Sequence, residues 1–299
     1  MTMFVIGRHG QLAQSFAERG RDDDELLLSG RPDFDLATAG SARTAILAAR
    51  PSLVINAAAF TAVDLAETEQ AAAYRINAEA AGEVAAAARE LGVPVIHIST
   101  DYVFDVTGTS PYTEEAATKP INAYGRTKLA GEDAVRGANP DHLILRTSWL
   151  ISPFGRNFVR TMIDLGRQRD RLSVVADQYG NPTSALDLAD AILTVARRLA
   201  IGDRTGLGQT YHLAGTGIAS WFDLAVAVQE EVGSGAHVTP IATADWPTPA
   251  ARPAYSALDS SKFARDFGHQ MPEWRASLGP IVARIASGMP ASLTQRRPR

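Results

Sequence analysis

Short apolar runs recur along the first half of the chain, separated by longer Ala-rich segments with helical propensity. Runs that are apolar throughout, rather than alternating, are typical of strands buried on both faces of a parallel sheet. We therefore predict strands at residues 3–6, 25–28, 53–56, 95–99 and 143–146. The clearest helix is predicted over residues 77–91, because Gly92 and Pro94 form a stop signal before the next strand. This alternation predicts an α/β fold with a Rossmann-type, doubly wound parallel sheet.

The pattern becomes less regular after residue 150. Residues 157–169 are predicted to be helical, 172–175 to form a strand, and 186–199 to form a long amphipathic helix that could return to the sheet. The segment that follows is rich in proline and glycine. We expect a first domain over residues 1–150, with a helix near 185–200 returning to it. A smaller mixed α/β domain is expected over residues 151–299, interleaved with the first.

Composition narrows the possible function classes. The 299 residues include no cysteine, which excludes a disulfide framework, a thiolate nucleophile and a Cys-ligated metal. A net charge of -4 provides no basic field, so no nucleic-acid partner is expected. No signal peptide is recognised, and no apolar run approaches the roughly 18 residues of a membrane span. We therefore expect a soluble, cytoplasmic protein with no membrane partner.

The first predicted strand leads directly into a glycine-containing turn and then a helix. The turn reads Gly7-Arg8-His9-Gly10-Gln11-Leu12-Ala13. A cofactor pyrophosphate would need bare backbone there, because side chains would block its approach to the N–H groups at the helix start. Ala13 takes the place of a third glycine and is small enough for close helix packing. The spacing indicates a dinucleotide site, and an ordinary tight turn is the alternative.

Two further strand ends bear on a nucleotide. Residues 57–59 are all alanine and would let a cofactor lie against the strand end, although alanine runs more often serve packing. Residues 28–31 lack the carboxylate that would bind a ribose 2′-hydroxyl, and Arg31 could bind a 2′-phosphate. NADPH is therefore modestly favoured, while Asp35 a little further along keeps NADH possible.

Tyr124 and Lys128 stand four residues apart in a segment of helical character, which places both side chains on one helix face. The chain has 7 tyrosines, and its lysines are Lys119, Lys128 and Lys262. A Tyr-x-x-x-Lys pair would therefore arise by chance in only about 0.07 of shuffled sequences. The alternative is an exposed helical pair without a function.

Reduction of a ketone explains why these two residue types belong together. As hydride reaches the carbonyl carbon, negative charge develops on the oxygen, and an acid must deliver a proton there. A phenol with a pKa near 10 is a slow proton donor unless a cation stabilises its phenolate, and Lys128 would supply that cation. The end of the predicted strand 95–99 adds hydroxyl groups at the edge where an α/β sheet presents its functional groups.

Together these blocks resemble the extended short-chain dehydrogenase/reductases, and within them the reductases of nucleotide-linked 4-keto sugars. The resemblance covers nearly the whole chain. It is carried by Gly7-x-x-Gly10-Gln11-Leu12, Asp35-Leu36, residues 56–59 and 61–64 with Glu67, 99–104, 124–132, 146–149, 157–158, 177–180 with 182–183, and a group between Pro247 and Lys262. It implies NAD(P) binding by the first domain and sugar-nucleotide binding by the second. The implied reaction reduces the C4 keto group of dTDP-4-dehydro-L-rhamnose to dTDP-L-rhamnose with NADPH or NADH.

The resemblance also implies residue roles. The catalytic triad would be Thr100, Tyr124 and Lys128, with Tyr124 as proton donor and Lys128 also holding the nicotinamide ribose. Besides Arg31, the implied cofactor contacts are Gly7, Gly10, Gln11, Leu12, Asp35, Leu36, Ala57, Ala58 and Ala59. The sugar pocket would be lined by Asp101, Tyr102 and Trp149, and the nucleotide half of the substrate would contact Asn181 and Arg252. Without the resemblance, Trp149 would be interpreted as a core aromatic, Asp101 as a turn or cap residue and Arg252 as a solvated charge.

Some members of the family build a metal-bridged dimer from glutamates near the first helix and near the helix 186–199. Ser15 and Leu186 stand at those places here, so we expect no metal and either a monomer or a homodimer. Two other functions stay open. The chain could reduce a different nucleotide-linked 4-keto-6-deoxyhexose, because residue types do not reveal sugar stereochemistry. It could also be a non-catalytic, dinucleotide-binding regulatory subunit.

Overall fold

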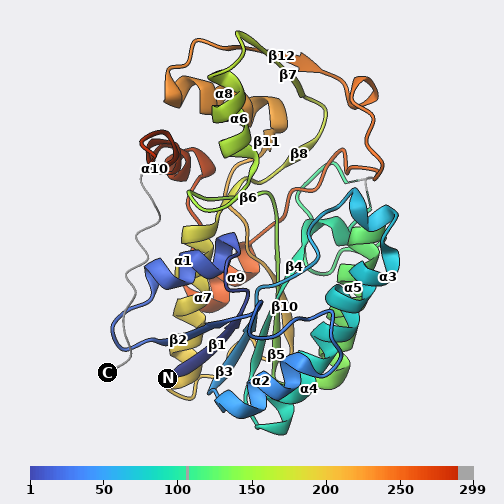
Figure 1. Cartoon of the computed structure of the whole chain (residues 1–299), viewed down its shortest axis with the longest axis vertical. Coiled ribbons are helices and arrows are strands. Elements are labelled where there is room, and N and C mark those ends of the chain that lie inside the picture. Colours follow the sequence, from blue (N-terminus) through green and yellow to red (C-terminus); the bar gives the residue numbers. More distant parts are fainter. Residues whose placement is uncertain (106–107, 289–299) are drawn as a thin grey trace.

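The computed structural model describes residues 1–105 and 108–288. Its centre is a six-stranded parallel sheet with the strand order β10-β5-β4-β3-β1-β2 (Figure 1). All five predicted strands are present, so the predicted doubly wound α/β fold is confirmed. The strands are β1 (Thr2–Ile6), β2 (Glu25–Ser29), β3 (Leu53–Asn56), β4 (Val95–Thr100), β5 (His142–Thr147) and β10 (Gln209–His212). The sequence pattern missed β10, because this edge strand buries only its last two residues.

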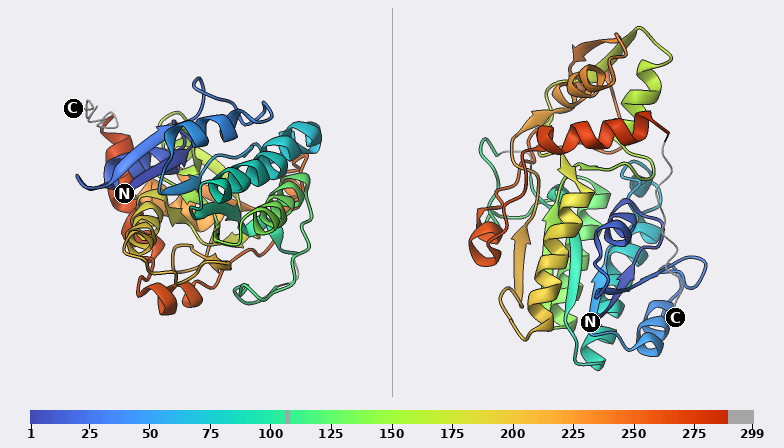
Figure 2. Two further views of the ribbon diagram at one scale, coloured as in Figure 1. Left: turned by 90° about the horizontal axis from the view of Figure 1, so that it is seen from below. Right: turned by 90° about the vertical axis from the view of Figure 1, so that its left-hand side faces the viewer.

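Helices cover both faces of the sheet (Figures 1 and 2). Along β1, Met3 and Val5 point into one core, whereas Phe4 and Ile6 point into the other. This alternation explains why the strand is apolar throughout. The first core is closed by α1 (Gln11–Arg19), α7 (Ala185–Ala200) and α9 (Ser261–Phe267), and the second by α2 (Ser41–Ala49), α4 (Ala80–Glu90) and α5 (Ala123–Ala138).

The helix before β4 begins earlier than predicted. α3 (Gln70–Tyr74), a π-helical turn (Arg75–Glu79) and α4 follow one another without a break, so the prediction that the helix starts at residue 77 is wrong. Asparagine often caps a helix, but the Asn77 amide accepts from Phe60 N at 2.8 Å and donates to Thr127 Oγ1 at 3.0 Å. Asn77 therefore ties this helix to α5 instead of starting it.

Residues after β5 build a further core from α6, α8 and α10 (Figure 1). The predicted helix 157–169 corresponds to α6 (Phe158–Gly166), which Asn157 caps and which ends earlier than expected. The other two helices are α8 (Trp221–Val232) and α10 (Trp274–Ala286). Short strand pairs join β7 (Arg171–Val175) with β12 (His237–Ile241), β6 (Leu150–Ile151) with β9 (Thr183–Ser184), and β8 (Tyr179–Gly180) with β11 (Ala219–Ser220).

We call the part of the molecule built around this core the upper part; within it, α10 lies on the side toward the sheet (Figure 2). Arg284 of α10 forms an ion pair with Glu18 of α1 at 2.7 Å. The upper part and the sheet domain are therefore linked by an ion pair in addition to the covalent connections of the chain. The predicted division of the chain at residue 150 stays a prediction. Within the part of the chain that the structure describes, no helix combines the length and apolar character needed to cross a membrane.

Candidate active site

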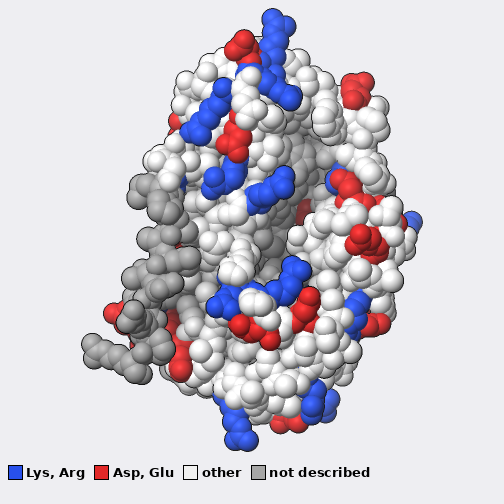
Figure 3. Space-filling view, viewed as in Figure 1, with Lys and Arg blue, Asp and Glu red and all other residues white. Residues whose placement is uncertain are grey.

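All six strands run in the same direction, so their carboxyl ends meet at one edge, beneath the upper part (Figure 1). Ligands of open α/β sheets bind at this edge. The turn after β1, the segment after β3 and the end of β4 all reach it. Figure 3 shows the molecule hollowed between its upper and lower parts, with basic side chains above and below the hollow. Such an arrangement suits an anionic ligand.

The start of α5 is fixed by polar contacts from three directions. Asn122 is the N-cap, and its Oδ1 accepts a hydrogen bond from Gly125 N at 2.8 Å. Its Nδ2 donates to Ala251 O at 2.9 Å, which attaches the C-terminal part of the chain. Ala123 N donates to Glu67 Oε1 at 2.7 Å. The first turn of α5, which carries Tyr124, is therefore held from both halves of the molecule.

Gly125 allows α5 to approach the end of β4 closely. A Cβ at this position would lie 2.1 Å from Tyr102 O, in the short 3-10 helix Asp101–Val103 that follows β4. Without that side chain, the rings of Tyr102 and Tyr124 meet edge to face, with centroids 5.7 Å apart. Two residues predicted for substrate binding and catalysis thus lie side by side.

A chain of hydroxyl and carboxyl groups runs from Tyr124 through Thr100 to Asp101. The Thr100 side chain lies close enough to Tyr124 to affect its pKa, and Thr100 Oγ1 donates to Asp101 Oδ1 at 2.9 Å. The Ser256 side chain also lies close enough to Asp101 to lower its pKa, but Asp101 Oδ2 is buried and has no hydrogen-bond partner among the described residues. A hydroxyl has one proton, so Thr100 can donate to Asp101 or to Tyr124, but not to both at once, and donation to Tyr124 is the arrangement that lowers the Tyr124 pKa.

Burial changes the acidity of both ends of this chain. It raises the pKa of Tyr124 to about 12, and the charge of Asp101 adds to the rise, while the Thr100 side chain opposes it. Burial also raises the pKa of Asp101 to about 6, against the opposing effects of Ser256 and Thr100. Tyr124 is therefore protonated at neutral pH and holds the proton that a reduction needs.

Lys128 follows Tyr124 by one turn of α5 and is buried. Its Nζ donates to Ile98 O at 2.7 Å and lies 3.5 Å from His97 Nε2. Burial lowers the pKa of Lys128 to about 8, and the charge of Glu132 partly offsets this. Lys128 and Tyr124 share a helix face, but among the described residues no hydrogen bond joins them. The predicted stabilisation of the Tyr124 phenolate by Lys128 stays a prediction.

The turn after β1 lies beside the end of β3, as a dinucleotide site requires. Gly7 has a φ of 125°, which side chains disfavour, and a Cβ there would lie 3.5 Å from the Ala57 carbonyl. Gly10 precedes α1 and provides no side-chain cap. The Gln11 side chain accepts from Ser152 Oγ at 2.8 Å, which links this turn to the upper part. Leu12 is buried in the first core, so only its backbone can face a ligand.

The remaining predicted cofactor residues lie around the ends of β2 and β3. Ala58 and Ala59, like Ala57, are partly buried at the sheet edge. Arg31 is exposed, and within the described residues it forms no hydrogen bond or ion pair. Asp35 Oδ1 accepts from Ala37 N, and the Leu36 side chain is buried in the second core. The buried Leu36 side chain therefore anchors the loop after β2 to the second core.

Trp149 has an unusual backbone conformation at the edge of the upper part. Its φ of 43° is in the left-handed region, which costs energy for a large side chain. The ring stacks on Trp221 with centroids 3.6 Å apart and 5° between planes. On another side it abuts Gly180, where a Cβ would lie 2.6 Å from the indole. The surroundings thus hold a partly exposed indole in one orientation, as a binding surface requires.

Asn181 and Arg252 differ in how freely their side chains could contact a substrate. The Asn181 amide is buried, donates to Gly217 O at 2.8 Å and accepts from Leu258 N at 2.7 Å. This geometry favours a structural role, and its contact with substrate stays a prediction. Arg252 Nη2 pairs with Asp64 Oδ2 at 2.8 Å, across the two halves of the chain. Its charge reaches Tyr102, where it opposes the rise of the pKa that burial causes.

Several residues of the site were not predicted from the sequence. They are His97 and Glu132 beside Lys128, Trp221 beneath Trp149, and Ser256 on Asp101. A signal existed for His97, because a histidine interrupts an otherwise apolar strand. Glu132 and Ser256 stand in blocks that carry the family resemblance, but neither was assigned a role from the sequence. No signal existed for Trp221, whose contact with Trp149 spans many residues of sequence.

Comparisons with known proteins agree with this geometry. Residues 1–287 match the RmlD substrate binding domain family. A dTDP-4-dehydrorhamnose reductase of Sinorhizobium fredii is 46% identical over 94% of this chain and 97% of its own length. Two crystal structures of dTDP-4-dehydrorhamnose reductases each cover 95% of this chain and 99% of their own, with a TM-score of 0.89. One, from Clostridium acetobutylicum, is 38% identical. The other, from Bacillus anthracis in complex with NADP, is 35% identical.

The family match spans both halves of the chain, and the relatives named above match it over nearly their full lengths. Each is named as a reductase of the same sugar nucleotide. The likeness therefore extends beyond the sheet to the upper part that holds Trp149 and Arg252. This chain belongs to the RmlD substrate binding domain family, the family of the dTDP-4-dehydrorhamnose reductases.

Proposed function

We propose that this protein reduces the C4 keto group of dTDP-4-dehydro-L-rhamnose to dTDP-L-rhamnose, with Tyr124 delivering the proton. The observation that carries this proposal is the buried group of Tyr124, Thr100 and Asp101 at the carboxyl edge of the sheet, in which Thr100 donates to Asp101 and lies beside Tyr124. The family supplies the substrate class. The turn at Gly7 supplies a place for the nicotinamide cofactor at the same edge.

The residues around this turn fit a dinucleotide. No side chain caps the start of α1, so its first N–H groups remain available for an anion. A Cβ at Gly10 would meet no atom of residues 1–105 or 108–288 within 4 Å, so packing among these residues does not require glycine there. An approaching pyrophosphate would require it. When bound, NADPH or NADH would supply the hydride that reaches the carbonyl carbon.

We infer a preference for NADPH. Arg31 is exposed at the end of β2 and forms no ion pair in the described part of the chain, so its guanidinium is available for a 2′-phosphate. Arg8 lies nearby but pairs with Asp33 at 2.7 Å. The relative from Bacillus anthracis binds NADP, which supports the same choice. Replacing Arg31 with alanine should weaken NADPH binding and leave NADH binding unchanged.

The chain's own residues explain how the proton moves. Tyr124 keeps its proton at neutral pH because its pKa is about 12, and gives it up as negative charge develops on the substrate oxygen. The phenolate left behind needs a donor, and Thr100 can turn its single proton from Asp101 toward Tyr124. Asp101 then keeps Ser256 as a neighbouring polar side chain. Thr100 therefore serves as a reversible donor between the two groups.

Residues of both halves would hold the sugar nucleotide. Tyr102 and Trp149 offer ring surfaces near Tyr124, and the stack on Trp221 keeps the Trp149 indole in place. The Arg252 guanidinium can bind the diphosphate if it exchanges Asp64 for the ligand.

We further propose that the enzyme works in the cytoplasm as a monomer or homodimer. Cell fractionation would test the location, and analytical ultracentrifugation would test the oligomeric state.

The direct test measures loss of the near-ultraviolet absorbance of NADPH when the keto-sugar nucleotide is added. Tyr124→Phe should lower kcat by about 10²–10⁴-fold while NADPH affinity changes little. Tyr74→Phe removes the same hydroxyl from an exposed ring and should leave kcat unchanged. Native turnover by Tyr124→Phe would exclude Tyr124 as the acid.

A panel of 4-keto sugar nucleotides tests the substrate. The highest kcat/KM should be obtained with dTDP-4-dehydro-L-rhamnose. A higher value for another 4-keto-6-deoxyhexose would show a reductase of different specificity. If the protein bound NADPH tightly but reduced no member of the panel, the regulatory-subunit alternative would be favoured instead.

A further inference from the structure

We propose that His97 is a positioning residue for Lys128. In this proposal a neutral imidazole accepts a hydrogen bond from the Lys128 ammonium and donates one to Asn56. The ammonium is thereby kept charged in a buried place, with one N–H left for the ligand side. The importance of Lys128 rests on the proposed function, but the contact itself does not.

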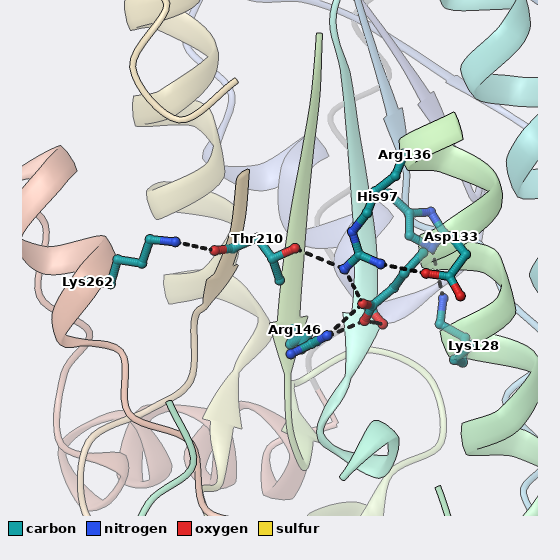
Figure 4. Close-up of polar contacts among 9 residues, drawn as sticks. His97, Lys128, Asp133, Arg136, Arg146, Thr210 and Lys262 are labelled. Carbon is teal, nitrogen blue, oxygen red and sulfur yellow. Dashed lines mark hydrogen bonds and ion pairs between the residues drawn. The ribbon is translucent and has the colours of Figure 1, made fainter. Parts of the chain in front are cut away.

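His97 lies in the middle of β4 and is only 1% exposed. Its neighbour in register on β3 is Asn56, and Asn56 Nδ2 lies 3.2 Å from His97 Nδ1. The other ring nitrogen, Nε2, lies 3.5 Å from Lys128 Nζ. Figure 4 shows the two side chains next to each other. A buried polar ring is costly unless both nitrogens find partners, and here one strand and one helix provide them.

The charges around His97 keep it neutral. Burial holds the pKa of His97 well below its ordinary value, and the positive charges of Lys128 and Arg136 act in the same direction. A neutral imidazole has one N–H donor and one acceptor nitrogen. The remaining question is which nitrogen carries the proton.

The contact with Lys128 determines which nitrogen of His97 carries the proton. An ammonium has three donors and no acceptor, so the nitrogen facing it, Nε2, must be the acceptor. Nδ1 then carries the proton and requires an acceptor from Asn56. In the structure Asn56 Oδ1 is buried and has no hydrogen-bond partner among the described residues. A half turn of the amide, whose two ends are nearly isosteric, places this oxygen at His97 Nδ1.

Lys128 has few other sources of stabilisation. Ile98 O accepts one of its hydrogen bonds. Glu132, one turn along α5, attracts the ammonium, but its carboxylate also binds Arg146 through two hydrogen bonds and Arg136 through one (Figure 4). The net charge of this cluster is positive, so Glu132 cannot fully compensate burial. A neutral acceptor at position 97 therefore matters for keeping Lys128 protonated.

The scarcity of lysine makes a direct measurement possible. Protein labelled with ζ-¹⁵N lysine contains only Lys119, Lys128 and Lys262, and loss of one signal in Lys128→Met assigns Lys128. Titration of the ligand-free protein then gives its pKa. In His97→Met we expect that pKa to fall by about 1–2 units, because a hydrogen bond to a charged group is lost. His97→Gln keeps a neutral acceptor and should restore most of the shift.

A second histidine provides the control. His142 is also buried, but it lies at the start of β5, where its Nδ1 contacts Asn139 O. His142→Gln should leave the Lys128 titration unchanged. An unchanged Lys128 pKa in His97→Met, or an equal fall in His142→Gln, would overturn the proposal.

The tautomer can be tested in the unaltered protein, which covers the case in which His97→Met does not fold. Long-range ¹H–¹⁵N spectra of the imidazoles should show His97 protonated at Nδ1. Protonation at Nε2 would contradict the proposal. Neither measurement uses turnover, so failure here is distinguishable from failure of the proposed reductase activity.

Discussion

Replacing Glu132 with glutamine removes one negative charge from the helix that carries Tyr124 and Lys128. Glu132 is fully buried, and its carboxylate accepts from Ser99 Oγ at 2.6 Å and from Arg146 at 2.9 and 2.7 Å. A glutamine side chain keeps one oxygen but turns an N–H toward these donors. The variant therefore buries the Arg146 guanidinium without a compensating charge.

The ion pair between Glu132 and Arg146 is buried, so removing one partner should lower the free energy of unfolding strongly. The side-chain exposures are 4% for Arg146 and 0% for Glu132, and removing one partner of a buried pair costs about 3–5 kcal/mol. For a chain of this size, each kcal/mol lowers Tm by about 2 °C, so we expect Glu132→Gln to lower Tm by about 6–10 °C. Activity should fall as well, because α5 loses an anchor on β5.

Calorimetry and urea denaturation of the wild type and Glu132→Gln measure this cost. The matched control is Glu90→Gln, because Glu90 pairs with Arg43 at 2.7 Å at the surface and should contribute within about 0.5 kcal/mol. A Glu132→Gln variant no less stable than Glu90→Gln would refute the reasoning.

The pH dependence of stability provides a second test of the contribution of Glu132. Burial acts to raise its pKa, but the hydrogen bonds and charge of Arg146 outweigh this and hold the pKa below its ordinary value of 4.5. A carboxyl whose folded pKa is depressed contributes stability above its unfolded pKa and loses it as pH falls through the folded value. The difference in unfolding free energy between wild type and Glu132→Gln should therefore shrink below pH 4.5.

Three further predictions follow from the site. Gly125→Ala should lower both kcat and stability, the latter by about 1–3 kcal/mol, because the new Cβ would lie 2.1 Å from Tyr102 O; Gly137→Ala in the same helix meets nothing within 4 Å and should not destabilise. The Asp101 pKa is raised to about 6, so Asp101 should make folding less favourable as pH rises from 3.8 toward 6. The unfolding free energy of wild type relative to Asp101→Asn should therefore fall across that window, and a difference between the two proteins that stays constant would contradict this. Trp149→Ala should raise KM for the sugar nucleotide more than the Kd for NADPH, and equal affinity of both proteins for the sugar nucleotide would remove Trp149 from the pocket.

Strands were easier to predict than helix boundaries, for a physical reason. A strand buried on both faces is mostly apolar. β1 shows this pattern directly, and β3 and β4 show it apart from polar side chains toward α5 and at the strand ends. The edge strand β10 begins with exposed polar residues and leaves no such pattern. Asn77 sits inside a helical course because its amide serves tertiary contacts with Phe60 and Thr127, which local sequence does not encode.

In the candidate site, too, one feature could be predicted from the sequence and another could not. The spacing of Tyr124 and Lys128 predicts a shared helix face, and both lie on α5 as expected. The direction of the Lys128 ammonium was not predictable, because its partners Ile98 and His97 come from β4, about thirty residues earlier. A buried ammonium must use its donors within the chain, and that requirement, rather than proximity to Tyr124, explains its orientation in the structure.

The sheet face toward α5 carries a row of polar side chains that explains how the catalytic helix is placed. Asn56 and His97 are neighbours in register, as are Ser99 with Arg146 and Arg146 with His212. Apolar contacts tolerate sliding, whereas hydrogen bonds with fixed directions do not. The bonds from Ser99 and Arg146 to Glu132, together with the contact between His97 and Lys128, therefore fix both the rotation and the height of α5 on the sheet. Since Tyr124 lies two turns before Glu132 on this helix, the same row of polar residues sets the position of the Tyr124 hydroxyl at Thr100.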